Sequence, residues 1–304
     1  MSFQSLNVNG ITWHDSVNPS EEDLVELQHK YRFHKLDIED CLSENERPKI
    51  EEYSEYLFIV LHIAVKIGSR VVKEEVNIFL GKHFVVTISE GKTDVIAKLW
   101  KQLHQSQKHR EEFLQQGTGF FLYKLLDQLF DAGFPLIDSI TKELRRIEVE
   151  LFEKEEGPMN ILRDILTLKR NIITMRSIIF PQRAVIAQLE HKNPDFISQD
   201  LEIYFDDVSD AIERQWSLLD TAKEMSDALQ ETHESWLGHR TNSVIRVLTI
   251  FSVTMVPLTF MTGLYGMNVQ LPFQDSSGAF AVLLLIMMLV MGGLIGFFAH
   301  KKWL

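Results

Sequence analysis

Short apolar runs in the first third of the chain predict a small sheet. They are rich in β-branched and aromatic residues, are bounded by turn formers, and cover residues 56–67, 74–81 and 83–89. Residues 20–31 have the pattern of a helix instead, with Ser20 as its N-cap and Asp23 three positions later. We therefore expect an α/β domain over residues 1–116.

After about residue 117 the apolar positions recur at spacings of three and four, which is the period of an amphipathic helix. Residues 120–153 follow this pattern with an expected kink at Pro135, and residues 160–190 follow it with an interruption at Pro181. These segments predict long helices that pack together as a bundle.

Residues 201–264 predict one very long helix. Pro257 is the only proline in this stretch, and Gly238 and Gly263 are its only glycines. At 1.5 Å per residue such a helix is roughly 90 Å long, which exceeds the diameter of a small domain. We expect it to project from the body as a stalk, so that the helix bundle and stalk cover residues 117–242.

Two apolar runs near the C-terminus predict membrane spans. Residues 247–265 and 279–299 contain no charged residue, and each run is close to the roughly 20 residues that cross a bilayer core. Buried core helices are the alternative, but two such runs in succession favour spans. The expected segments are a first transmembrane helix at 243–268, an external loop at 269–277, and a second transmembrane helix with a basic C-terminus at 278–304.

Basic residues beside the two runs predict their orientation. Arg240 and Arg246 precede the first run, Lys301 and Lys302 follow the second, and the intervening loop has no basic residue. Basic residues favour the cytoplasmic side. We therefore expect a multi-pass protein of the plasma (inner) membrane with both termini in the cytoplasm.

Composition narrows the function classes. The formal net charge of −12 argues against nucleic acid as a partner and is compatible with attracting cations. The single cysteine, Cys41, excludes an internal disulfide and fits a reducing compartment. The "EGKT" at residues 90–93 fails as a phosphate-binding loop because Val86 stands in the place of the first glycine. We expect no enzyme activity and no organic cofactor.

One face of the first expected span carries the candidate chemistry. Steps of three or four residues back from Gly263 give Thr259, Val256, Ser252, Leu248, Ile245 and Asn242, followed by Glu234, Glu231 and Asp227. Small and hydroxylated residues in a span are typical of helix packing, but with acids below them the stripe also fits a cation path.

Asn268, just after the first span, has two interpretations. It is a simple turn former if Gly266 supplies a left-handed C-cap to the helix. Alternatively, it is one member of a ring of side-chain amides, one from each subunit, at the mouth of a pore. Such a ring would contact the water shell of Mg²⁺, an ion that dehydrates reluctantly.

The "YGMN" at residues 265–268, between two terminal spans, resembles the CorA family of divalent-cation channels. The likeness continues in "LDIEDCLSENERPKIEEYSEYLFIVLH", "VNIFLGKHFVVTISE", "YFDDVSDAIER" and "TNSVIRVLTI", and so covers nearly the whole chain. The resemblance implies an α+β membrane protein that assembles as a funnel-shaped homopentamer in the lipid bilayer. Its outer selectivity filter would be Gly266, Met267 and Asn268.

The resemblance also implies roles for other residues. The positions that match the family's pore lining are Asn242, Thr259, Gly263 and Glu231. Ile245 and Leu248 match a hydrophobic constriction, which can close by excluding water. Asp207 matches an acid that binds a regulatory Mg²⁺ between subunits, and Glu74 or Glu75 are candidate partner acids. Mg²⁺ would then be both the ion that enters under the membrane potential and the internal ion that holds the pore closed.

Two features leave the transported ion open. The loop "VQLPFQDSS" has Asp275 as its only acid, so Co²⁺ or Zn²⁺ remain alternatives to Mg²⁺. The eleven histidines include no pair with convincing ligand spacing. A membrane-anchored oligomeric adaptor without transport is the alternative of another class.

Overall fold

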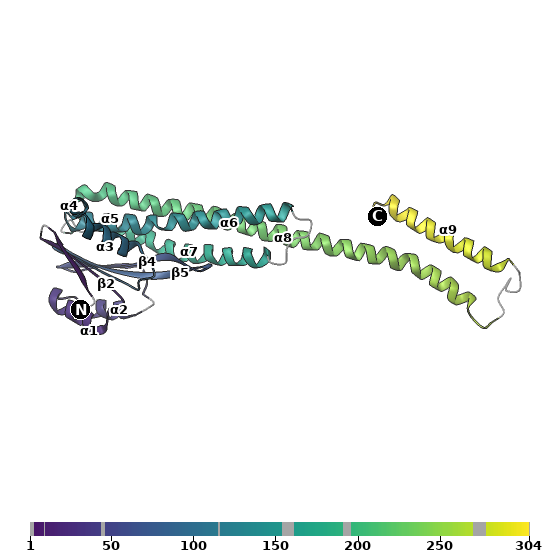
Figure 1. Ribbon diagram of the computed structural model, residues 1–304, viewed down its shortest axis with the longest axis horizontal. Helices are drawn as coiled ribbons and strands as arrows, with labels where there is room; N and C mark the ends of the chain where they lie inside the picture. The colour runs from purple at the N-terminus through teal and green to yellow at the C-terminus, as the bar shows by residue number, and fades with distance from the viewer. Residues whose placement is uncertain are drawn as a thin grey trace. The chain divides into compact units, whose positions relative to one another are not determined.

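The computed structural model describes residues 3–8, 10–43, 46–114, 116–153, 161–190, 196–269 and 278–303 (Figure 1). The chain divides into two compact units, Met1–Gln230 and Glu231–Leu304, and the long helix α8 contributes residues to both. The predicted external loop at 269–277 falls almost wholly outside the described residues, since only Val269 of it is described.

The first unit is built on a mixed sheet. Its described strands are β1 (Gln4–Val8), β2 (Ile11–Val17), β3 (Lys49–Glu52), β4 (Tyr56–Ile67), β5 (Arg70–Gly81) and β6 (Phe84–Ser89). They lie in the order β1-β2-β6-β5-β4-β3, with β2 and β6 parallel and the other neighbours antiparallel. The three predicted strands are confirmed as β4, β5 and β6, which form the middle of the sheet.

Helices cover both faces of this sheet. The helices of the first unit are α1 (Glu21–Tyr31), α2 (Lys35–Leu42), α3 (Val95–Gln105), α4 (Gln107–Leu114), α5 (Thr118–Asp131), α6 (Gly133–Glu153) and α7 (Ile161–Glu190), with a 3₁₀ turn at Gln199–Leu201 before α8 (Glu202–Tyr265). Leu24 and Leu27 of α1 pack with Phe58 and Phe79 on one face. The larger core lies on the other face, between the sheet and α3 to α8.

Local sequence signals explain two helix ends. The predicted capping box of α1 is confirmed: the Asp23 backbone N–H donates to Ser20 Oγ, and Asp23 Oδ2 accepts from the Ser20 N–H. The prediction of one helix kinked at Pro135 is wrong, because α5 ends at Asp131 and α6 begins at Gly133. Pro135 therefore lies in the first turn of α6, where its missing N–H removes no intrahelical hydrogen bond.

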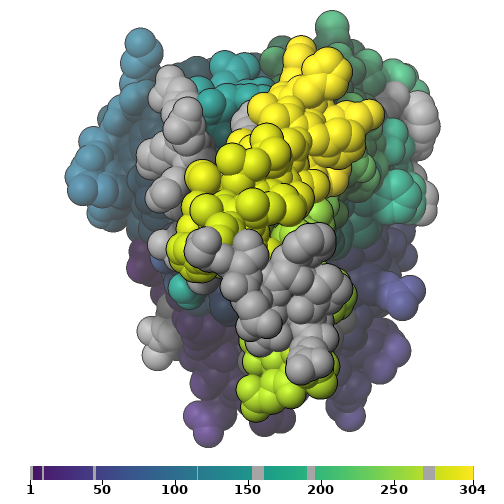
Figure 2. Space-filling model, turned by 90° about the vertical axis from the view of Figure 1, so that its right-hand side faces the viewer, coloured from purple at the N-terminus to yellow at the C-terminus, as the bar shows by residue number. Residues whose placement is uncertain are grey.

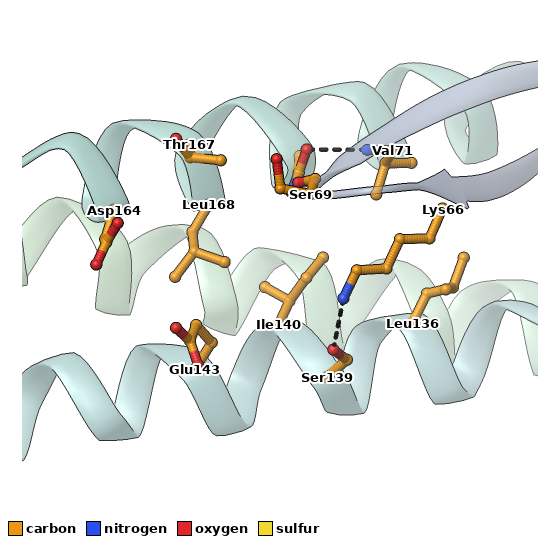
Figure 3. Close-up of a pocket in the computed structure, with 11 residues that line it drawn as sticks. Lys66, Ser69, Val71, Leu136, Ser139, Ile140, Glu143, Asp164, Thr167 and Leu168 are labelled. Atoms are coloured by element: carbon orange, nitrogen blue, oxygen red, sulfur yellow. Dashed lines mark hydrogen bonds between the residues drawn. The ribbon is translucent and has the colours of Figure 1, made fainter.

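The sheet is tied to the helical layer at the turn between β4 and β5 (Figure 3). Asn171 of α7 accepts from the Val71 N–H at 3.0 Å and donates to the Ser69 carbonyl at 2.9 Å. Lys66 Nζ donates to Ser139 Oγ of α6 at 3.1 Å. These contacts border a cavity of about 210 Å³ between the turn, α6 and α7.

Asn171→Ala is expected to lower the stability of this unit by about 2 kcal/mol, since it leaves the Val71 N–H and the Ser69 carbonyl without their partner. In a unit of this size that corresponds to roughly 5 °C in the melting temperature of the full chain in detergent. The control is Thr167→Ala, one turn earlier on α7, whose hydroxyl donates only to the Arg163 carbonyl. Equal shifts for both variants would contradict the role given to Asn171.

The second unit consists of the distal part of α8 and of α9 (Ala279–His300). Both helices contain segments long and apolar enough to cross a membrane. The surface of α9, yellow in Figure 2, is largely apolar, and Phe280 is 76% exposed. Pro257 lies inside α8 without ending it. Apolar side chains exposed in this number require a cover, which a bilayer or other chains would supply.

Candidate functional site

The predicted stripe on α8 is exposed along its length in the single chain. Asn242, Thr259 and Gly263 are exposed, and the large aliphatic side chains of Ile245 and Leu248 are 54% and 62% exposed. Apolar side chains of this size rarely stay uncovered on a soluble surface. From Asn242 to Gly263 the stripe is therefore a surface that no other described part of the chain covers.

The helix α9 lies against a different face of α8. Leu258 and Thr262 of α8 border an apolar cavity of about 350 Å³ with Phe280 and Met287 of α9. On the same side of α8, Thr254 is buried. At about 100° per residue, this side points roughly 130° away from the stripe. The packing of α9 thus leaves the stripe uncovered.

The end of α8 places the predicted filter residues directly after the apolar segment. The Gly266 N–H donates to the Thr262 carbonyl at 2.9 Å, and the Met267 N–H donates to the Leu264 carbonyl at 3.3 Å. The alternative of a left-handed C-cap at Gly266 is wrong, because Gly266 does not have a positive φ. A Cβ at this position would lie 3.1 Å from the Thr262 carbonyl oxygen, which favours glycine there.

The side chain of Asn268 has no hydrogen-bond partner within the described part of the chain. Asn268 is exposed, and Met267 is 52% exposed beside it. The Asn268 amide is available to a ligand.

The acids below the apolar segment differ in their surroundings. Glu231 is exposed at the start of the second unit. Asp227 is instead paired with Lys169 of α7 at 2.8 Å and with Lys223 at 3.3 Å. The hydrogen bond from Lys169 holds the pKa of Asp227 below its ordinary value. Of these two acids, only Glu231 is exposed and outside the ion pairs of α7 and α8.

Asp207 is exposed on α8 and lies near two acids of α5 that the sequence analysis missed, Asp127 and Asp131. Burial raises the pKa of Asp127, and the negative charges of Asp131 and Asp207 add to this, while Lys124 opposes it. The spacing of four residues, which puts Asp127 and Asp131 on one face of a helix, was the available signal.

Within one subunit this acidic cluster is incomplete as a metal site. No group of three His, Cys, Asp or Glu side chains in the described ranges is arranged to hold a metal ion. A divalent cation at Asp207 would therefore need ligands from a neighbouring subunit or water molecules to complete its shell.

Glu74 and Glu75 lie in β5, on opposite faces of the sheet, and both are buried. Glu74 accepts a hydrogen bond from the Lys92 backbone N–H at 2.9 Å, and burial raises its pKa. This position gives Glu74 a structural role at the end of β6. The structure does not bring either glutamate to Asp207 within the chain, so their pairing with it across a subunit boundary stays a prediction.

The family model described as CorA-like Mg²⁺ transporter protein matches residues 8–301 of the chain. The chain belongs to the CorA family. The residues matched by the CorA model include the sheet, the helical layer, α8 with the residues that follow it, and α9.

Individual relatives agree with this assignment. YfjQ of Bacillus subtilis, a candidate metal ion transporter, is 34% identical over 96% of this chain and 89% of its own length. The cobalt/magnesium transport protein CorA of Thermotoga maritima is 29% identical over 96% of this chain and 83% of its own. Zinc transport proteins from several bacteria match at lower identity.

A solved structure supports the fold as well. The complete structure of the CorA magnesium transporter from Methanocaldococcus jannaschii superposes with a TM-score of 0.87 over 99% of this chain and 94% of that chain, at 20% identity. The expected fold class, with an N-terminal α/β domain, a long helix and two C-terminal apolar helices, is thereby confirmed.

Proposed function

We propose that this chain is the subunit of a divalent-cation channel that admits Mg²⁺ through a pore formed by several copies. The observation that carries this proposal is the exposed amide of Asn268, directly after the apolar segment of α8 and at the end of an exposed stripe. One such helix cannot enclose a water-filled path. Copies arranged around an axis, with the stripe inward, would enclose one and would cover Ile245 and Leu248. By resemblance, the assembly is a homopentamer.

The chemistry along the proposed path fits a hydrated cation. Amide oxygens of an Asn268 ring would accept hydrogen bonds from the water shell of Mg²⁺, so that the ion need not dehydrate at the entrance. Thr259 and the Gly263 carbonyl would supply further oxygens inside the span, followed by the Leu248 and Ile245 rings. Glu231 would attract the cation at the cytoplasmic end. Asn242 would lie between the aliphatic rings and this acid.

The ion itself is tested by uptake into proteoliposomes. The native protein is reconstituted with a Mg²⁺-sensitive, a Co²⁺-sensitive or a Zn²⁺-sensitive dye inside, and each ion is offered in turn. The proposal predicts Mg²⁺ uptake, with Co²⁺ as a second ion of similar hydration. Uptake of Zn²⁺ without Mg²⁺ would contradict the proposed ion and would place this chain with the zinc transport proteins of the family.

Internal Mg²⁺ is proposed to close the pore by bridging acids of adjacent subunits at Asp207. Without a cation these acids repel one another, and the proximity of Asp127 and Asp131 adds to this repulsion. Bound Mg²⁺ would neutralise the cluster and hold the subunits together; its loss would let them move apart and let the constriction hydrate.

Asp207→Asn is expected to raise the internal Mg²⁺ concentration that half-inhibits uptake by roughly tenfold, since the loss of one ligand charge weakens binding by about 1.4 kcal/mol. The measurement is the uptake rate of proteoliposomes loaded with increasing Mg²⁺. Asp206→Asn is the matched control, because Asp206 is the adjacent exposed acid on α8. An unchanged inhibition curve for Asp207→Asn would remove Asp207 from the proposed gate.

A further inference from the structure

A polar cavity of about 230 Å³ lies in the first unit, bordered by residues of α2, β5 and β6. Its oxygen-bearing lining consists of Asn18, Ser43, Glu75, Asn77, Ser89 and Glu90. It is separate from the stripe on α8, and Asp207 does not border it. Neither the proposed pore nor its filter uses it.

Two buried oxygens at this cavity lack a donor. Glu75 and Asn77 are 4% and 3% exposed, and neither Glu75 Oε2 nor Asn77 Oδ1 has a hydrogen-bond partner in the described structure. The amide of Asn77 donates to the other carboxylate oxygen of Glu75 at 3.1 Å, which fixes the two side chains against each other. A buried acceptor without a partner costs about 1–3 kcal/mol, so two such acceptors on hydrogen-bonded side chains indicate a missing donor or cation.

The neighbouring basic side chains do not hydrogen-bond to these oxygens. His62 Nε2 lies 3.8 Å from Glu75 Oε2 and is bonded to the Glu46 carbonyl at 2.9 Å. Lys73 Nζ lies 4.0 Å from the same oxygen. Glu90 brings a second carboxylate to the cavity. Its Oε1 accepts from the Glu75 backbone N–H at 3.4 Å, and its Oε2 is paired with Lys92.

The donor set determines the class of ligand. The cavity offers carboxylate, amide and hydroxyl oxygens, which suit hard cations such as Mg²⁺ and Ca²⁺, whereas Zn²⁺ and Cu²⁺ favour imidazole and thiolate. Cys41 also borders the cavity, but burial raises the pKa of its thiol well above the ordinary value, so it is not a thiolate ligand at neutral pH.

We propose that this cavity is a binding site for a hard divalent cation, held by Glu75, Asn77 and Glu90 within a single subunit. The remaining ligands are water molecules, for which the cavity has room. Lys73 beside Glu75 and Lys92 beside Glu90 offset part of the negative charge, so binding is weak, with a Kd on the order of 1 mM. The site lets the α/β domain respond to cytoplasmic Mg²⁺ independently of contacts between subunits.

The test uses Mn²⁺ as a paramagnetic probe for Mg²⁺ and the purified full chain in detergent. All variants are made in an Asp207→Asn background, which removes the proposed intersubunit site from the titration. Free Mn²⁺ is counted by electron paramagnetic resonance, and the readout does not depend on transport. Failure of the channel proposal therefore leaves this result unaffected.

Glu75→Gln is expected to remove one Mn²⁺ per subunit, whereas Glu22→Gln, an exposed acid on α1, should remove none. Asn77→Asp adds a ligand charge and is expected to lower the Kd roughly tenfold. Tighter binding cannot arise from misfolding, so this second variant stays informative if Glu75→Gln does not fold. Unchanged Mn²⁺ binding by both variants would overturn the proposal and would assign the two oxygens to buried water.

Discussion

Asn268→Ala is expected to reduce Mg²⁺ uptake into proteoliposomes by about 10- to 100-fold. Asn268 is the residue whose exposed amide would contact the hydrated ion at the entrance, and hydrogen bonds to charged groups are worth about 1.5–3 kcal/mol. In a ring, one substitution removes the amide from every subunit at once. The loss should therefore exceed the effect of any other single change along the path.

Val269→Ala is the matched control for this experiment. Val269 is the next residue, is 51% exposed, and carries no hydrogen-bonding side chain. Size-exclusion chromatography in detergent must give the same oligomer for both variants. Normal uptake by correctly assembled Asn268→Ala would contradict the assignment of this amide to the filter.

Leu248→Asn is expected to give a pore that still conducts when internal Mg²⁺ is high. A ring of leucines closes a pore by excluding water, and an amide at each position would hold water in the constriction. Leu248 is 62% exposed in the single chain, so the substitution leaves no cavity in the subunit core. The measurement is the ratio of uptake rates with high and with low internal Mg²⁺, which should approach one.

Val247→Asn tests whether position on the helix decides this outcome. Val247 is 65% exposed and lies about 100° around α8 from Leu248, outside the stripe. The Val247→Asn substitution introduces the same amide at the same depth along the helix as Leu248→Asn, and inhibition by internal Mg²⁺ should persist. Equal leaks from both variants would show that any polar residue at this depth disturbs the pore, and the Leu248 gate would be wrong.

The middle strands could be predicted because their apolar runs are continuous, whereas β2 could not. Its sequence, ITWHDSV, contains His14, Asp15 and Ser16, all of which are buried in the structure. Asp15 and Trp13 share the hydroxyl of Thr87 on the parallel neighbour β6. Such a partner is far away in sequence, so a local pattern of polar residues gives no sign that they are buried.

The candidate path on α8 could be predicted from the helical period alone, because the period places residues on one face of a helix without any tertiary information. The acids near Asp207 could be identified only from the structure. Asp127 and Asp131 approach it only because α5 packs beside the start of α8, and no local pattern predicts which helices become neighbours. The sequence offers Glu74 and Glu75 as candidate partners of Asp207 only because they are acidic. Their burial on opposite faces of β5 follows from the alternation of side chains along a strand.

The most direct test of the channel account is Mg²⁺ flux at a set membrane potential. Proteoliposomes with equal Mg²⁺ on both sides are given an inside-negative potential by a potassium gradient and valinomycin. At 100 mV a divalent ion gains about 4.6 kcal/mol, an equilibrium ratio of roughly 2,000-fold. The account predicts uptake that begins with the potential and stops when it is collapsed. Fully assembled protein that passes no Mg²⁺ under this potential would contradict the account and favour an oligomeric membrane anchor.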